Sequence, residues 1–291
     1  MLKLQTIVDI KPSEWQIGYE DRVLMLGSCF ADEMGEQMSR RGLHVTSNPF
    51  GTLYNPLSIA NAINSQFSIL SPSGARLFLN SQLVEYGGLW HSMDHHGSFS
   101  RPTKEEAEAA VAQSVEEMQK ALSDASVVIV TFGSAWVYEM EGRVVANCHK
   151  MPEAWFRRRR LSVDEIVEAW RPIVDRYPDK HWLFTVSPIR HIRDGLHENQ
   201  LSKATLLMAI EELINHPLPI TRKISYFPSY EIVQDELRDY RFYADDLVHP
   251  SSLAVNYIWE RFADTYCSPA TRNEMLIQLK RWKSEQHIPL H

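Results

Sequence analysis

Five short runs of apolar and β-branched residues alternate along the chain with longer stretches in which apolar residues recur at helical spacing. The short runs predict strands over residues 23–26, 43–46, 127–131, 182–186 and 224–227. The longer stretches predict helices over residues 30–41, 104–122, 162–176, 202–215 and 251–266, and the last three open on a serine that is suited to cap a helix. Strands that alternate with helices favour right-handed crossover connections. The pattern therefore predicts an α/β fold with a mostly parallel five-stranded sheet and helices on both faces.

Polar residues follow the end of every predicted strand. They are Ser28, the run from Asn48 to Gly51, the pair Gly133-Ser134, residues 187–193 and, after a longer connection, residues 246–249. The carboxyl ends of parallel strands share one edge of the sheet, and ligand sites of open α/β sheets lie there. A hydrophobic core does not require a polar cluster after each strand, so we expect these clusters to form one site.

Two segments depart from the alternation. Residues 78–99 and 136–152 each resemble a hairpin with a polar tip, and we expect both to be insertions that cover the edge with the polar clusters. No linker rich in Gly, Ser or Pro divides the sequence. We therefore expect residues 1–291 to form a single domain.

The composition indicates a soluble globular protein. Hydrophobic residues make up 44% of the chain and charged residues 23%, which suits a large core. The net charge of -7 provides no basic field for nucleic acid, and we expect the one basic run, 157–160, to be a solvated surface turn. No stretch approaches the roughly 18 apolar residues of a membrane span, and the amino terminus lacks a secretory h-region. The three cysteines, Cys29, Cys148 and Cys267, are an odd number without metal-type spacing, which argues against a disulfide framework. We therefore expect a reducing compartment, the cytoplasm.

Ser28 is the candidate nucleophile, because it lies where a buried strand gives way to a helix. A serine hydroxyl attacks well only when a base accepts its proton, and His249 is the candidate base. Asp246, three residues earlier, is suited to hold the imidazole in the required tautomer, while Asp245 competes for that role at four residues. The alternative is structural: Asp246 caps the following helix and His249 merely precedes a proline.

Backbone N–H groups near these residues are candidates for stabilising negative charge on a substrate oxygen. The N–H of Ser28 opens a predicted helix, and Gly51 and Gly133 allow further N–H groups to approach closely. Ordinary turn formation explains both glycines equally well. Cys29 is a rival nucleophile, since a thiol at a helix amino end can be activated.

Other reactive side chains fall in the insertions and after the fourth strand. One loop holds ligand types suited to zinc: His91, Asp94, His95 and His96. Such a loop more often carries surface or substrate-contact histidines, so we predict no metal and no other cofactor. His149 is expected to contact substrate or to pack the second insertion. Arg190 beside His191 is suited to bind an anionic group, or equally to form an interior ion pair.

These residues lie in blocks that resemble the GSCFA-domain proteins, a family named for a run found here at residues 27–31. Five further blocks follow in the order of that family: Asn48–Pro56, Thr131–Tyr138, Asn147–Pro152, Thr185–His191 and Tyr240–Pro250. The resemblance covers about residues 22–262. It leaves residues 267–291 as a helical extension.

The family in turn is similar to the wider SGNH, or GDSL-like, hydrolase superfamily. That resemblance implies a three-layer α/β/α sandwich of flavodoxin-like type, with Ser28 as nucleophile and Asp246 and His249 completing a triad. In the superfamily a glycine after the second strand and an asparagine after the third help to form the oxyanion hole. Gly51 matches the glycine, but the third block reads Gly133-Ser134-Ala135 and lacks the asparagine. Asn48 or the Ser134 hydroxyl is expected to substitute.

Residues and resemblance together predict a serine esterase or deacylase that acts through an acyl-Ser28 intermediate. The expected substrate is a small-molecule or glycan acyl ester, with the acyl group on a carbohydrate or another polar carrier. One alternative is an O-acyltransferase with the same triad, which a roof that excludes water favours. Another is a catalytically weak glycan- or lipid-binding protein, which the absent asparagine favours. A metal-dependent hydrolase built on the histidine loop is a more distant alternative.

Overall fold

A five-stranded, all-parallel sheet forms the centre of the computed structural model, which describes residues 6–65, 82–215 and 223–286. The strand order is β10-β9-β5-β1-β2, and every neighbouring pair is parallel. The strands are β1 (Arg22–Gly27), β2 (His44–Ser47), β5 (Val127–Phe132), β9 (His181–Val186) and β10 (Lys223–Phe227). All five predicted strands are confirmed to within one or two residues at each end. The direction in which strands are added reverses between β1 and β5, where ligand sites of such sheets lie.

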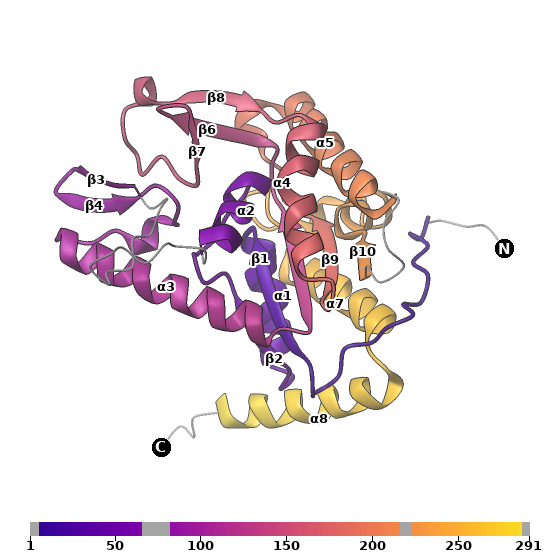
Figure 1. Ribbon diagram of the computed structural model, residues 1–291. Coiled ribbons are helices and arrows are strands. Elements are labelled where there is room, and N and C mark those ends of the chain that lie inside the picture. Colours follow the sequence, from indigo (N-terminus) through magenta and orange to yellow (C-terminus); the bar gives the residue numbers. More distant parts are fainter. Residues whose placement is uncertain (1–5, 66–81, 216–222, 287–291) are drawn as a thin grey trace, which may run out of the picture.

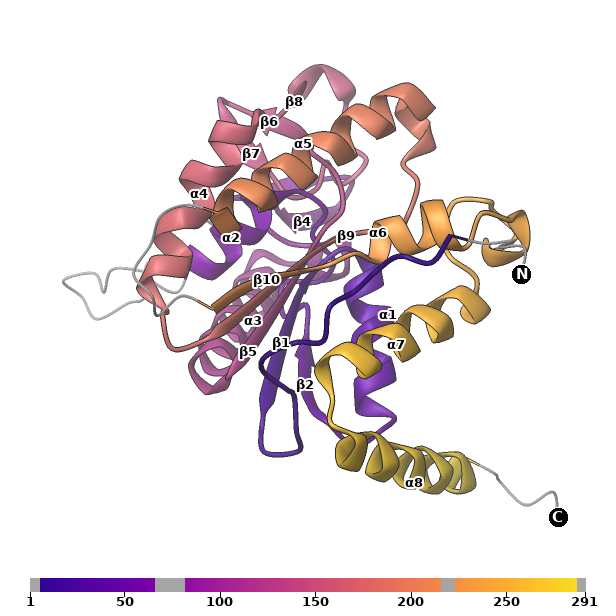
Figure 2. The ribbon, with the colours of Figure 1, turned by 90° about the vertical axis from the view of Figure 1, so that its right-hand side faces the viewer.

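Helices cover both faces of the sheet, so the predicted three-layer α/β/α sandwich is confirmed (Figure 2). One core contains Leu24 and Val128 together with α2 (Pro56–Asn64), α3 (Lys104–Asp124), α4 (Val163–Arg176) and α5 (Leu196–Asn215). The alternate strand residues, such as Met25 and Ile129, pack in a second core with α1 (Cys29–Ser39) and α7 (Ser252–Tyr266). Successive strand residues point to opposite faces, which explains why these strands are apolar throughout.

Several helices begin directly after a residue whose side chain caps the helix. Ser162 accepts a hydrogen bond from the N–H of Glu165 and forms a capping box with it, and Ser251 accepts from Ala254, as predicted. The predicted start at Ser202 is wrong, because α5 begins at Leu196. The helix α2, which the apolar pattern did not predict, begins after the cap residue Asn55.

Both predicted hairpin insertions are present, and they lie at the end of the molecule where the strands of the large sheet finish (Figure 1). The first is β3 (Leu83–Tyr86) with β4 (Leu89–Ser92), and residues 78–81 of its predicted range lie outside the described residues. The second pairs β6 (Trp136–Met140) with β7 (Arg143–Val145) and with a third strand, β8 (Arg157–Arg160). A small core joins the two insertions: Met93, Met140, Val145 and Met151.

The prediction that residues 157–160 form a turn is wrong, whereas their predicted surface position is confirmed, since three of the four arginines are exposed. This run forms the edge strand β8, because its arginines find acidic and aromatic partners on neighbouring elements. Arg159 pairs with Glu139 and Glu165, and Arg158 pairs with Asp194. The charge that suggested solvent exposure is thus largely neutralised within the protein.

The remaining short helical turns connect these elements: Gly97–Phe99, Glu153–Trp155, Ile192–Asp194, α6 (Ser229–Glu231), a π-helical turn at Ile232–Glu236, and Tyr240–Phe242. The expected C-terminal extension forms α8 (Pro269–Gln286), at the end of the molecule opposite the insertions (Figure 1), and residues 287–291 lie outside the described part. None of the helices in the described ranges has the length and hydropathy to cross a membrane.

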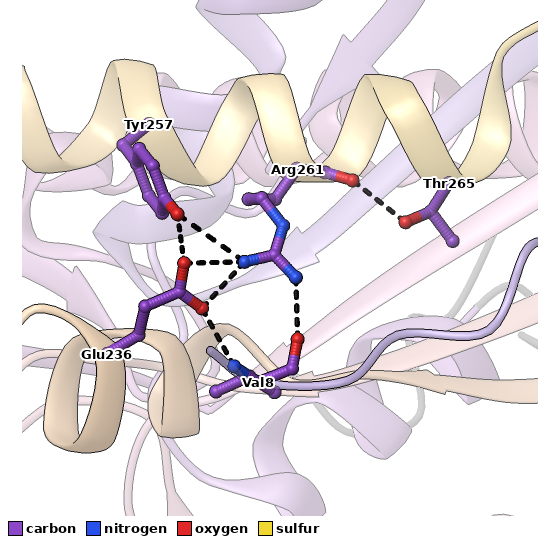
Figure 3. A network of polar contacts seen from close by, with 5 residues as sticks. All are labelled: Val8, Glu236, Tyr257, Arg261 and Thr265. Atoms are coloured by element: carbon purple, nitrogen blue, oxygen red, sulfur yellow. Dashed lines mark hydrogen bonds and ion pairs between the residues drawn. The ribbon is translucent and has the colours of Figure 1, made fainter. Parts of the chain in front are cut away.

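A buried polar network fastens the amino-terminal segment to α7 (Figure 3). The Glu236 carboxylate is fully buried and accepts from Arg261, from the Tyr257 hydroxyl and from the backbone N–H of Val8. Arg261 also donates to the Val8 carbonyl at 2.6 Å. A buried carboxylate is costly unless it is paired and hydrogen-bonded, and here each of its oxygens has partners. This network holds the turn before residues 240–250 in place.

Candidate functional site

The turn from β1 into α1 places Ser28 at the edge of the sheet. Gly27 has φ 131°, and a Cβ there would lie 2.0 Å from the Thr131 carbonyl oxygen, so only glycine fits between the central strands. Ser28 caps α1 with extended backbone, and its side chain makes no capping hydrogen bond. The residue is 0% exposed, and its Oγ is buried without a hydrogen-bond partner. Buried hydroxyls almost always have partners, so this free hydroxyl marks a position of functional interest.

Gly133, at the end of β5, lies directly beside Ser28. A Cβ on Gly133 would be 3.3 Å from the Ser28 Cβ and 3.0 Å from the Tyr54 carbonyl oxygen. The first and third polar clusters therefore meet, as the shared sheet edge predicts.

Asp246 and His249 form a hydrogen-bonded pair. Asp246 Oδ2 lies 2.6 Å from His249 Nδ1, and Asp246 Oδ1 accepts from the backbone N–H groups of Val248 and His249, each at 2.9 Å. These bonds, led by that from the His249 N–H, lower the pKa of Asp246 to about 2. The carboxylate therefore stays ionised in any ordinary assay buffer. Engaging Nδ1 leaves Nε2 of His249 as the ring atom for other chemistry, while Asp245 makes no such contact with His249 in the described structure.

Arg190 holds the loop that carries this pair. Its guanidinium donates to the Leu247 carbonyl, and its own backbone N–H donates to the Val248 carbonyl at 3.2 Å. The guanidinium carbon also lies 4.2 Å from the centre of the Tyr243 ring. The sequence suggested that Arg190 binds an anionic group or forms an interior ion pair. In the structure its guanidinium instead anchors the loop that carries Asp246 and His249. Leu247 adopts φ 57°, so this loop has backbone strain that such anchors offset.

No hydrogen bond joins Ser28 to His249 in the described structure. His191 follows Arg190, whose backbone binds the loop of His249. Burial, the largest cause, and then Lys203 and His249 lower the pKa of His191 to about 3, while the Gly133 backbone acts in the opposite sense. Its Nε2 is buried without a partner, and its ring meets the Tyr54 ring edge-on at 6.1 Å. The structure thus gathers Ser28, Gly133 and His191 at one edge, with His249 close to His191.

The backbone donors predicted for an oxyanion hole are already engaged. Gly51 donates to the Asn48 carbonyl at 2.7 Å, Gly133 and Ser134 both donate to Tyr54, and the Ser28 N–H donates to Thr131 at 3.2 Å. The Ser134 hydroxyl accepts from the Trp136 N–H at 3.1 Å. Each predicted donor is therefore near the site yet occupied by the protein itself.

Asn48 clamps the loop after β2 onto the turn that carries Ser28. Its Oδ1 accepts from the Gly27 N–H at 2.8 Å, and its Nδ2 donates to Asp32 at 2.8 Å. Asn48 itself has φ 44°, which asparagine tolerates better than most residues. The loop continues to Gly51, where a Cβ would lie 2.4 Å from the His96 Cβ. Asn48 thus acts on the serine turn through the Gly27 backbone.

The sequence profile of the GSCFA family matches residues 22–262, and this span includes every residue placed at the site above. The chain belongs to the GSCFA family. No protein of the curated collection matches it. Among solved structures, it is similar to a carbohydrate esterase family 2 (CE2) enzyme plus carbohydrate binding domain from Corynascus thermopiles (Myceliophthora fergusii). That similarity has a TM-score of 0.37 and 12% identity, and it covers 94% of this chain and 69% of the other.

Cys29, in the run that gives the GSCFA family its name, is held as a thiol. Burial, the largest cause, and the nearby Asp32 and Glu33 carboxylates raise its pKa, although the N–H groups of Cys29 and Phe30 act in the opposite sense. A thiol with a raised pKa is a poor nucleophile near neutral pH. Its environment therefore favours Ser28 over Cys29.

The histidines of the insertions bind protein groups. His95 lies between Ser92 Oγ at 2.7 Å and Ser114 Oγ at 2.8 Å, and its ring stacks on Phe50. His91 contacts Ser100 and the Tyr86 carbonyl, and His149 Nε2 donates to the Ser92 carbonyl at 2.7 Å. Burial lowers the pKa of His95 to about 3 and that of His149 to about 4. Within the described ranges no three metal-ligating side chains are grouped as a metal site needs. These contacts join the two insertions to each other and to α3.

The polar side chains of α5 that form hydrogen bonds with the loops of the site were not identified from the sequence. Asn199 accepts from the His191 N–H at 2.9 Å, Ser202 accepts from the Ala135 N–H at 2.8 Å, and the Lys203 ammonium donates to two loop carbonyls. Their spacing of three and four residues places them on one face of the helix. The helix start was predicted six residues too late, which left Asn199 outside the predicted helix and hid the common face of the three side chains.

Proposed function

We propose that this protein is a serine esterase or deacylase in which Ser28 is the nucleophile, His249 the general base and Asp246 the group that orients the base. The Asp246–His249 pair is the observation that carries the proposal. Asp246 Oδ2 accepts from His249 Nδ1, which favours the tautomer that leaves Nε2 free to accept a proton, and Oδ1 accepts from the His249 backbone N–H and so fixes the carboxylate. The free Ser28 hydroxyl at the end of β1 supports it.

In the proposed reaction Ser28 Oγ attacks the acyl carbonyl while His249 Nε2 accepts the hydroxyl proton. The tetrahedral intermediate collapses to an acyl-serine as His249 protonates the departing alcohol. Water then attacks the acyl-serine, His249 takes its proton, and Ser28 is regenerated with release of the acid. The hydrogen bond between Ser28 and His249 forms with bound substrate, as catalytic hydrogen bonds often tighten only in the complex.

For the substrate we propose a small acyl group on a carbohydrate or another polar carrier. The resemblance of the GSCFA blocks to SGNH-like hydrolases supports ester chemistry, and this support is by analogy of family. The described cysteines are free, which supports the further proposal of a reducing compartment, the cytoplasm.

Labelling with a fluorophosphonate probe tests the proposal, with mass spectrometry to locate the adduct. The wild-type protein is expected to carry the adduct on Ser28. Ser28→Ala should abolish labelling, and His249→Ala should slow it by at least 10²-fold because the base is lost. Cys29→Ala serves as the matched control and should label at the wild-type rate. An adduct on Cys29, or labelling that survives Ser28→Ala, excludes the proposed nucleophile.

The complete burial of Ser28 also favours a second function, acyl transfer to a sugar hydroxyl. A site closed to bulk water protects an acyl-enzyme from hydrolysis. Incubating the protein with an acyl ester and a range of sugars separates the two functions: a hydrolase yields free acid, whereas a transferase yields a new sugar ester.

A further inference from the structure

Lys203 is a buried cation at the site edge that the proposed mechanism does not use. It lies on α5, is 0% exposed, and its Nζ donates to the Gly133 carbonyl at 2.8 Å and to the Ser187 carbonyl at 2.7 Å. These carbonyls follow β5 and β9, so one side chain joins the ends of two adjacent strands.

The ammonium has no acidic partner among the described residues. Burial lowers the pKa of Lys203 to about 7. Two N–H donors are enough for the two carbonyls, and an uncharged side chain could supply them at lower cost in desolvation. A buried cation kept without a carboxylate is the kind of group that an active site uses for electrostatic stabilisation.

The position of Lys203 indicates where its positive charge acts. Its acceptor Gly133 is the residue that lies beside Ser28. The predicted backbone donors around Ser28 are already bound to protein carbonyls. The third block also lacks the asparagine that would donate to an oxyanion.

We propose that Lys203 is a positioning residue for the reaction at Ser28: its ammonium holds Gly133 against the serine and places a positive charge behind it, which stabilises the negative charge that develops on the substrate oxygen. This inference rests on the proposed function and identifies what replaces the missing asparagine. The effect is reciprocal, because an oxyanion beside Ser28 favours the charged form of Lys203 as much as that form favours the oxyanion.

The titratable groups that face Lys203 do not supply a competing charge. Cys29 on α1 has a raised pKa and is a neutral thiol, and His191 after β9 has a lowered pKa and is a neutral imidazole. Tyr230 on α6 presents its ring 5.6 Å from Nζ, and its own pKa is raised by burial. Ionisation of Lys203 is therefore the change near neutral pH that alters the charge behind Gly133.

Two substitutions separate the charge from the hydrogen bonds. Lys203→Gln keeps two N–H donors without charge, and Lys203→Met removes both donors and charge. Lys180 offers a matched control at the other edge of the sheet, since it is 4% exposed and donates to the Ala125 and Ser123 carbonyls at 2.8 and 3.4 Å. The measurement is the second-order rate of fluorophosphonate labelling at Ser28 between pH 6 and 9, with thermal melting of each variant.

Both Lys203 variants are expected to label about 10- to 100-fold more slowly than the wild type. This loss is smaller than the roughly 10²- to 10³-fold loss of a direct oxyanion donor, because Lys203 acts from behind Gly133. Lys180→Gln should label at the wild-type rate. The wild-type rate should fall as pH rises through about 7, where Lys203 loses its proton, and this fall should be absent in Lys203→Gln. If Lys203→Met does not fold, the labelling rate of Lys203→Gln and the pH profile of the wild type still test the role of Lys203.

Labelling of Lys203→Gln at the wild-type rate, with the alkaline fall intact, overturns the role of Lys203 and leaves the proposed function standing. Failure of the folded wild-type protein to label at Ser28 overturns both. The two failures are thus distinguished by one data set.

Discussion

The two halves of the proposed catalytic machinery are built in different ways. Ser28 is 0% exposed and lies on a turn that two central strands and Asn48 hold from below, whereas the side chains of Asp246 and His249 are each 48% exposed. The proposed nucleophile is therefore part of the core, and the proposed base belongs to a surface loop held by a few polar contacts. Changes near the serine should act mainly on folding, and changes in the loop mainly on the reaction.

The largest effect is expected from Asp246→Asn, which changes the loop half without touching the core. An amide in place of Oδ2 turns a donor toward His249 Nδ1 and so favours the tautomer with Nε2 protonated. The labelling rate at Ser28 should fall roughly 10³- to 10⁴-fold, with little change in melting temperature. The neighbouring carboxylate provides the control: Asp245→Asn should leave the rate within about twofold. A large loss in Asp245→Asn with none in Asp246→Asn reverses the assignment of the two aspartates.

A substitution in the turn that carries Ser28 is expected to lower the stability of the fold. Gly27→Ala places a Cβ 2.0 Å from the Thr131 carbonyl at φ 131°, and neither central strand can move away without opening the sheet. We expect the free energy of unfolding to fall by about 3–5 kcal/mol, measured by urea denaturation. Gly88→Ala, at φ 77° with no atom within 4 Å, keeps the strain without the clash and should cost about 1 kcal/mol. Equal losses at the two glycines would mean that the serine turn is not fixed by the sheet.

Arg190→Gln tests whether the loop that carries Asp246 and His249 must be anchored for the reaction, because it weakens this anchor while leaving both proposed catalytic residues unchanged. The variant loses the donor to the Leu247 carbonyl and the contact with the Tyr243 ring. A loop displaced by about 1 Å costs up to 10²-fold in rate, so we expect a 10- to 100-fold slower reaction. The exposed Arg193→Gln is the control and should have no effect. If Arg190→Gln instead lowers stability and leaves the rate unchanged, the anchor serves folding and not the base.

The same division separates what the sequence could predict from what it could not. The strands and the serine turn are encoded locally, by apolar runs that end at glycine and serine, and their positions were predicted to within two residues. The sharing of one sheet edge by Ser28, Gly133 and His191 follows from parallel topology alone. The triad assignment came from residue types and family resemblance, and it remains a proposal.

What could not be predicted depends on partners that are distant in sequence. The arginines of β8 were predicted to form a turn and not a strand, because their partners Glu139, Glu165 and Asp194 come from three other segments. Lys203 was not singled out from the sequence, since nothing local shows that the Gly133 and Ser187 carbonyls would surround it. Charged residues are usually solvated, so sequence rules predict exposure wrongly where tertiary hydrogen bonds stabilise a buried charge such as that of Lys203.

The smallest expected effect tests whether the free Ser28 hydroxyl belongs to function alone. Its Oγ is buried without a partner, so Ser28→Ala removes an unsatisfied polar atom and should raise the free energy of unfolding by about 1 kcal/mol. Ser229 is the matched control, because it is also 0% exposed but donates to the Val186 carbonyl at 2.7 Å and bonds to Thr185 Oγ1. Ser229→Ala should lower stability by about 1–2 kcal/mol in the same denaturation experiment. A gain of stability in Ser28→Ala would show that the Ser28 hydroxyl does not serve the fold, which favours a role in chemistry. A loss of stability would show that the hydroxyl has a structural partner in solution.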